Sequence, residues 1–128
     1  MKPVAVVSDG APAPVGPYSQ AMRSGSLVFC SGQIGIDPKS GELVKGGIRA
    51  EARRVMENLK AVLNEAGAGL DRVVKVEVFL ADMNDWPTFN EVYSGYFGAD
   101  TKPARYAVGG AKLPKDARVE VACIASLD

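Results

Sequence analysis

The sequence predicts an α+β fold in which a six-stranded mixed sheet carries two helices on one face. Two observations lead to this prediction. Val-rich runs typical of strands alternate along the chain with amphipathic stretches typical of helices, so neither element type occurs alone. A chain of 128 residues with 47% apolar content also has the usual size of one globular domain. We therefore expect a single domain that spans residues 1–128.

The first part of the chain reads as strands separated by a long connector. Residues 2–7 form a short strand pattern, and residues 8–17 hold three prolines and two glycines, a composition typical of an exposed connector. Strand patterns follow at residues 19–23 and 27–33. The intervening Ser24-Gly25-Ser26 is a tight-turn signal, so these two strands are expected to pair as a hairpin.

The middle of the chain predicts a helix followed by a strand. Apolar residues recur at helical spacing from Ile48 to Ala66. Gly67 and Gly69 follow, and both are suited to the left-handed conformation that ends helices. Residues 73–80 then alternate as a strand.

The last third predicts a second helix and two closing strands. Asp82 or Asp85 can cap a helix whose apolar face runs over residues 86–97. Strand patterns follow at residues 104–108 and 119–125, which completes the order βββαβαββ. Two helices can cover only one face of such a sheet. The other face also carries apolar residues, and this predicts self-association.

Composition narrows the classes of function. Fifteen basic residues balance fifteen acidic ones, and no run of five like charges occurs, so nucleic acid is not expected as a partner. The N-terminus is too interrupted for a signal peptide, and no apolar run is long enough to cross a membrane, so we expect a soluble cytoplasmic protein. Cys30 and Cys123 lie in strand-like apolar runs and are expected to be buried thiols.

The sequence contains no histidine, which removes the commonest general base and the commonest metal ligand. Any catalysis must then use carboxylate, phenol, arginine or bound water. Four polar signals occur beside strands or turns: Tyr18, Ser31 with Gln33, Arg105, and Glu120. Tyr18 alone is equally consistent with a turn tyrosine that packs against the body of the protein, and Ser31 with an ordinary strand end.

Arg105 and Glu120 each have a structural and a functional interpretation. Arg105 begins a strand, where it is either a solvated edge residue, an ion-pair partner of Glu120, or a residue that grips a substrate carboxylate with two parallel hydrogen bonds. In the last strand, Glu120 shares a face with Ala122 and Ile124 and is the odd charge there. It is either an ion-pair partner or a proton carrier with a perturbed pKa.

Several short segments form one ordered pattern along the chain: Gly16-Pro17-Tyr18-Ser19-Gln20-Ala21, Ser31-Gly32-Gln33-Ile34, residues 58–63, Asn90-Glu91-Val92-Tyr93, Pro103-Ala104-Arg105, Leu113-Pro114 and Val119-Glu120-Val121. Taken together, these segments resemble the RidA (YjgF) family of reactive intermediate deaminases, and the resemblance covers essentially the whole chain.

The resemblance implies a chorismate-mutase-like fold and a homotrimer with clefts between subunits. It also implies hydrolysis of enamines and imines of the 2-aminoacrylate and 2-iminobutanoate type to 2-keto acids and ammonia, without a cofactor or a metal. On the matching positions, Arg105 would bind the substrate carboxylate, and Glu120 and Tyr18 would lie near the attacking water. Ser31 and Asn90 would help to line the cleft.

One segment departs from the family pattern. Many members have cysteine two residues beyond the arginine, where this chain has Ala107, and a larger residue is replaced by Gly109-Gly110. In a strand, Arg105, Ala107 and Gly109 face the same way. Small residues beside the guanidinium are therefore expected to widen the substrate-binding pocket.

Two rival functions keep the same residues. The same trimer could bind or sequester a small carboxylate, or regulate a partner, without turning anything over. The ribonuclease activity sometimes attached to the family is the second rival. It usually requires an acid/base pair that titrates near neutrality, metal ligands or a cationic groove, and the sequence shows none of these.

Overall fold

A computed structural model describes residues 2–98, 100 and 102–128. Its strands form one six-stranded sheet in the order β1-β2-β3-β6-β4-β5. All neighbouring strands pair antiparallel except β4 and β5, which are parallel, so the sheet is mixed as predicted. The strands are β1 (Val4–Val6), β2 (Ala21–Ser24), β3 (Leu27–Gln33), β4 (Val73–Leu80), β5 (Ala104–Val108) and β6 (Val119–Ser126).

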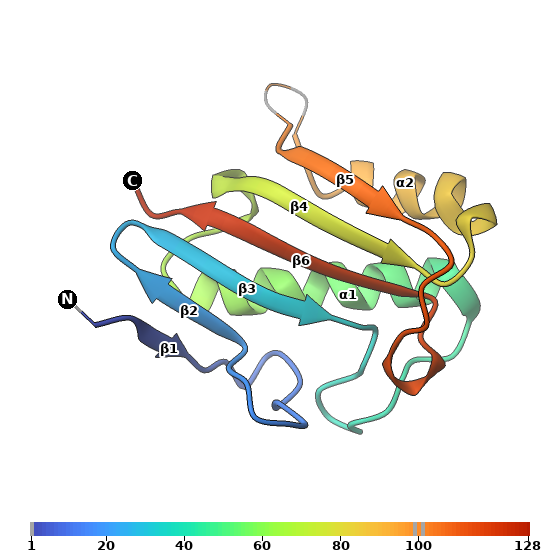
Figure 1. The fold of residues 1–128 in the computed structure, drawn as a ribbon, viewed down its shortest axis with the longest axis horizontal. Helices are drawn as coiled ribbons and strands as arrows, with labels where there is room; N and C mark the ends of the chain where they lie inside the picture. Colours follow the sequence, from blue (N-terminus) through green and yellow to red (C-terminus); the bar gives the residue numbers. More distant parts are fainter. Residues whose placement is uncertain (1, 99, 101) are drawn as a thin grey trace.

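Two α-helices pack side by side on one face of this sheet, and the other face is open (Figure 1). Helix α1 (Gly47–Glu65) and the shorter α2 (Trp86–Ser94) cover the side chains that point to their side from the central strands. In β6, Val119, Val121, Cys123 and Ala125 are buried toward the helices, and the alternate residues from Glu120 onward face the other way. The predicted fold class and the predicted facing of β6 are thus confirmed.

Local sequence signals predicted the ends of most helices and strands to within one or two residues. The hairpin turns at Gly25, whose φ is 58°, a left-handed value that glycine adopts without steric cost. Gly67 ends α1 in the same way with φ 88°, but Gly69 has φ 177° and is ordinary extended backbone, so its predicted left-handed role was wrong. Asp82 caps a short 3-10 turn, Met83–Asp85, by accepting from the N–H of Asn84, whereas Asp85 makes no side-chain cap.

Helix α2 is shorter than its apolar pattern predicts. It ends at Ser94, before Gly95, although Phe97 still reaches the core beneath the helices. The Lys102 ammonium donates to the carbonyls of Phe97 and Gly98, which satisfies backbone acceptors beyond the helix end. The pattern of burial therefore runs further than the helix.

Residues of this chain cover part of the open face of the sheet. A second, small cluster formed by Ile34, Ile36, Leu113 and Ala117 packs against Phe79 at one end. Elsewhere on this face, Leu27, Phe29 and Tyr106 are each about two-fifths exposed, and the Tyr106 ring lies edge-on to Phe79. The expectation that the second face of the sheet has nothing from this chain to cover it was therefore wrong at the end where the connectors before β2 and before β6 lie.

Among the described residues, no helix combines the length and the apolar character that crossing a membrane requires.

Candidate active site

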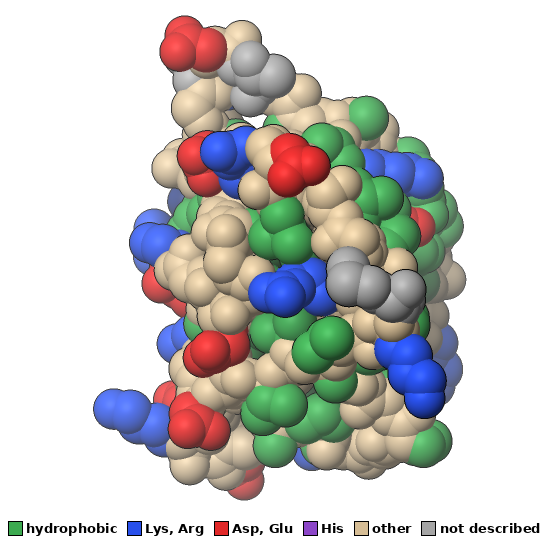
Figure 2. All heavy atoms as spheres, turned by 90° about the vertical axis from the view of Figure 1, so that its left-hand side faces the viewer, with side chains coloured by type: hydrophobic (Ala, Val, Ile, Leu, Met, Phe, Trp, Pro, Cys, Tyr) green, Lys and Arg blue, Asp and Glu red, His purple; other side chains and the backbone are tan. Residues whose placement is uncertain are grey.

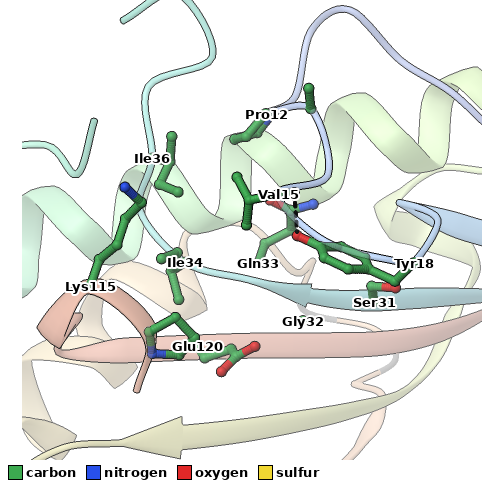
Figure 3. Close-up of a pocket in the computed structure, with 12 residues that line it drawn as sticks. Pro12, Val15, Tyr18, Ser31, Gly32, Gln33, Ile34, Ile36, Lys115 and Glu120 are labelled. Atoms are coloured by element: carbon green, nitrogen blue, oxygen red, sulfur yellow. Dashed lines mark hydrogen bonds between the residues drawn. The ribbon is translucent and has the colours of Figure 1, made fainter. Parts of the chain in front are cut away.

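A pocket of about 400 Å³ opens at the end of β3, between the connector before β2 and the connector before β6 (Figure 3). It brings together Tyr18, Ser31 and Glu120, which the sequence had singled out separately. Most of the remaining wall is apolar, from Pro12, Ala13, Val15, Ile34, Ile36 and Pro114, and it also includes Gly32, Gln33 and Lys115. A carboxylate in such surroundings is poorly solvated.

A β-bulge gives Glu120 its place. Between the pairs Cys30↔Cys123 and Gln33↔Val121, β3 advances one residue more than β6, so Ser31 and Gly32 oppose one residue of β6. A Cβ added at Gly32 would lie only 2.3 Å from Oε2 of Glu120. The carboxylate therefore rests directly on the backbone of Gly32, where no side chain fits.

The electrostatics of Glu120 follow from this position. Burial raises the pKa of its carboxyl above the usual value, and among the described residues no charged neighbour offsets the effect. In Figure 3 the carboxylate points along the sheet toward Gly32 and the Tyr18 side of the pocket. A carboxyl with a raised pKa exchanges protons more readily near neutrality, which suits a proton carrier better than a fixed counter-ion.

Tyr18 and Ser31 are both engaged by hydrogen bonds within the chain. The Tyr18 hydroxyl accepts from the N–H of Val15 at 3.4 Å, so its own proton remains free to donate. The Ser31 hydroxyl donates to the carbonyl of Ser19 at 2.6 Å and ties β3 to the residue after Tyr18. Ser31 lines the pocket but also fixes its shape.

Two buried amides, which sequence reasoning missed, hold the walls of the pocket. The Gln20 Nε2 donates to the carbonyls of Ser8, Ala11 and Pro12, and its Oε1 accepts from the N–H of Ser8 at 2.6 Å. On the opposite side, the Asn58 Nδ2 donates to the carbonyls of Ile34 and Ile36. The only sequence signal was a polar residue inside an apolar pattern, which does not reveal its partners.

Arg105 lies elsewhere, on the helix-covered side of the sheet. It is paired with the buried Val76 in the parallel β4–β5 register, whereas Glu120 is paired with Phe79 of the open face. The guanidinium Nη1 donates to Oδ1 of Asn90 at 2.7 Å. Arg105 and Asn90 thus come together in a second pocket, of about 470 Å³. Among the described residues Arg105 forms no ion pair with Glu120, so that one of the alternatives for Arg105 is wrong within the chain.

Aromatic rings hold the Arg105 guanidinium in place. Its central carbon lies 4.6 Å from the ring centroids of both Trp86 and Tyr93. Burial raises the pKa of the Tyr93 phenol, which keeps that ring neutral beside the cation. Trp86 and Tyr93 were expected on the apolar face of a helix, and their contact with arginine was not predicted.

The small residues beyond Arg105 have local explanations. Ala107 packs against the main core, and a Cβ at Gly109 would lie 2.9 Å from both Cβ and Sδ of Met83. Gly109 therefore makes room for Met83 rather than for open space. Neither residue lines the pocket of Arg105 within one chain. The wider substrate-binding pocket that these small residues predict therefore stays a prediction.

Metal and charge patterns add no further site. Across the described ranges, His, Cys, Asp and Glu never gather in a group of three or more that could hold a metal ion. Cys30 and Cys123 are free, buried thiols that face each other across β3 and β6, as expected. Figure 2 shows acidic and basic side chains interspersed on one end of the molecule, without a continuous area of positive charge on that side.

Fold, pocket and residue pattern together define a small α+β protein with a half-buried carboxylate of raised pKa in a largely apolar pocket and a separate arginine held between two aromatic rings. The family model described as Endoribonuclease L-PSP matches residues 8–127. This chain belongs to that family, which includes the RidA, YjgF and RutC proteins.

Relatives are similar over most of their length. A RutC family protein of Pyrococcus abyssi is 54% identical over 120 residues, 94% of each chain. The 2-iminobutanoate/2-iminopropanoate deaminase of mouse is 49% identical over 115 residues, 90% of this chain and 84% of the mouse chain. A crystal structure of E. coli TdcF with bound serine aligns with a TM-score of 0.91 and 39% identity, over 96% of this chain and 98% of that one.

Proposed function

We propose that this protein hydrolyses reactive 2-imino and 2-enamino acids to 2-keto acids and ammonia. The observation that carries the proposal is the Glu120 carboxyl, which lies in an apolar pocket on the bulge at Gly32, faces Tyr18, and has a pKa raised by burial. The deaminase activity of relatives such as the mouse protein, and the serine bound by TdcF, support a small amino-acid-like substrate.

The chemistry needs little more than a positioned water and a proton carrier, because a protonated imine is already electrophilic. Glu120 accepts a proton from water as the water oxygen bonds to the imine carbon, which gives a carbinolamine. The protonated Glu120 then gives that proton to the amino nitrogen. The C–N bond breaks and releases ammonia, while the hydroxyl gives its proton back to Glu120 as the C=O bond forms. Glu120 then passes this proton to the ammonia, which leaves as ammonium. Tyr18, whose O–H is free to donate, orders the water.

We further propose that a second copy of the chain completes the site by presenting its Arg105 to the substrate carboxylate. Arg105 and Glu120 lie on opposite faces of the sheet in one chain, so a single chain offers two incomplete halves. Apolar side chains on the open face, including Phe29 and Tyr106, offer a surface for assembly into the homotrimer that the family resemblance implies.

The activity is tested by generating 2-iminobutanoate in situ with an amino-acid oxidase or a dehydratase and measuring ammonia and keto-acid release. Wild-type protein should accelerate release, and Glu120→Gln and Arg105→Ala should each lose most of that acceleration. If release with wild-type protein is no faster than with buffer alone, the deaminase hypothesis is wrong. The remaining possibility would then be a protein that only binds small carboxylates.

The shared site is tested by mixing the two inactive variants. After dissociation and joint reassembly, a cleft that receives its arginine from the Glu120→Gln chain and its carboxylate from the Arg105→Ala chain is intact. Random mixing of equal amounts should restore about a quarter of wild-type activity, since each half is correct in about half of the clefts. If the reassembled mixture stays inactive, the site is not shared between copies.

A further inference from the structure

The connector between β5 and β6 contains a strained turn beside the pocket of Glu120. Lys115 and Asp116, in the short 3-10 turn Pro114–Asp116, have φ values of 56° and 54°. They are the only non-glycine residues of the described chain with positive φ. Two successive left-handed residues make a turn that strongly favours Asn-Gly, so Lys-Asp is a costly choice for connecting strands.

The surrounding structure enforces this conformation. The N–H groups of Asp116 and Ala117 donate to the carbonyls of Leu113 and Pro114 at 3.2 and 3.1 Å. Leu113 and Ala117 are buried in the second apolar cluster on either side of the turn. One residue further on, the N–H of Arg118 donates to the buried carboxylate of Glu51 at 2.8 Å. A left-handed backbone held from both sides in this way points to a role for the side chain it presents.

That side chain brings charge to the pocket. Lys115 is the only cationic residue among the described residues that line the Glu120 pocket. Figure 3 shows it leaving the turn and running past Ile34 toward Ile36, whereas the Glu120 carboxylate points the opposite way. The ammonium and the carboxylate therefore lie toward different ends of one largely apolar pocket, and they form no ion pair.

We propose that Lys115 is a specificity residue that draws anionic substrates into the Glu120 half of the site. The inference deepens the proposed function, because a 2-imino acid carries a carboxylate. Without Lys115, the substrate carboxylate would meet only another carboxylate, that of Glu120, and apolar walls in the pocket of one chain. A fixed positive charge at its edge raises the local concentration of anions, an effect that salt screens.

Two substitutions at the same position separate the charge from the strain. Lys115→Met removes the ammonium and keeps a long unbranched side chain in the strained backbone. Lys115→Asn removes the ammonium and relieves the strain, because asparagine tolerates the left-handed region. Lys112→Met is the matched control, since Lys112 lies three residues earlier and does not line this pocket.

Both Lys115 variants should lose about threefold to tenfold in kcat/KM at low ionic strength, mainly through KM, and the loss should shrink toward nothing at about 1 M salt. Lys115→Asn should nevertheless have a higher Tm than wild type, and Lys112→Met should lose less than either. A Lys115→Asn variant as active as wild type, or a loss that persists at high salt, would overturn the proposal.

A binding measurement keeps this test separate from the test of deamination. Calorimetric titration with 2-oxobutanoate should show weaker, less salt-dependent binding to Lys115→Met than to wild type. Equal affinities with equal salt dependence would refute the role of Lys115 even if deamination is observed. Absence of turnover by wild type would refute the proposed activity and leave this comparison of affinities intact.

Discussion

The position of the Glu120 carboxylate depends on the absence of a side chain at residue 32, and Gly32→Ala tests that dependence. The added Cβ would lie 2.3 Å from Oε2, 2.9 Å from Cδ and 3.0 Å from Cγ of Glu120, whereas ordinary contacts begin at 3.4 Å. The carboxylate must therefore move by about 1 Å. A misplacement of this size costs about 100-fold in rate when a group must be aligned with a reacting atom.

We expect kcat of Gly32→Ala to fall by about 100-fold, with a smaller change in KM because Arg105 lies on another strand and on the other face of the sheet. Stability should change by less than about 1 kcal/mol, since the atoms that must yield are the flexible end of a side chain facing a pocket. The assays are steady-state imine hydrolysis and thermal unfolding.

Gly41→Ala is the control for the general cost of replacing a glycine. Gly41 has φ 74°, and a Cβ there would meet nothing within 4 Å, so that variant should lose stability through backbone strain and keep its kcat. Wild-type kcat in Gly32→Ala would refute the reasoning, because the proton carrier would then not depend on the place that the bulge gives to Glu120.

Three further outcomes follow from the same contacts. Gln20→Glu replaces the amide donor that serves three carbonyls, so it should destabilise the fold by about 2–4 kcal/mol in denaturant unfolding; an unchanged midpoint would contradict the role of that amide. Trp86 is the only tryptophan and lies against Arg105, so its fluorescence should change on titration with 2-oxobutanoate in wild type and stay flat in Arg105→Ala. Burial raises the pKa of Glu51 in the folded protein, so protonation of Glu51 at low pH stabilises the fold. This stabilisation is lost as pH rises through the folded-state pKa. Glu51→Gln, which keeps an acceptor for the Arg118 N–H, should therefore have a higher Tm than wild type at about pH 7.5 and an equal one at about pH 4; a lower Tm at the higher pH would show that the charge is needed.

Much of the fold could be read from the sequence because local signals and the global fold agree. The period-2 pattern of β6 predicted which residues face the helices, and the residues after α1 predicted its end. The signals failed where tertiary contacts override local pattern. Phe97 continues the apolar face of α2 but follows the helix end, and Gly69 is extended although it follows a helix. At the first place burial continues beyond the end of the helix, and at the second the backbone is extended where composition suggested a left-handed residue.

The sequence singled out the residues of the candidate site one by one but did not specify their arrangement. Tyr18, Ser31 and Glu120 come together because β3 pairs antiparallel with β6, although Tyr18 and Ser31 lie far from Glu120 in sequence. The facing of Glu120 followed from alternation within one strand. The facing of Arg105 depends on the parallel pairing of β5 with β4, which no local signal specifies. The sequence therefore left an ion pair between Arg105 and Glu120 open as one alternative, and the two residues lie on opposite faces of the sheet.

The contacts that make the pocket rigid have the weakest sequence signals of all. Gln20 and Asn58 bind backbone carbonyls in two irregular segments that have no secondary structure to satisfy them. A buried carbonyl without a donor costs about 1–3 kcal/mol, so an amide that serves two or three of them fixes the segment more firmly than apolar packing does. The proposed hydrolysis requires Tyr18 and Glu120 to keep their separation. The two amides hold the walls on either side of the pocket. We therefore expect substitutions at Gln20 and Asn58 to lower activity, although neither side chain contacts substrate.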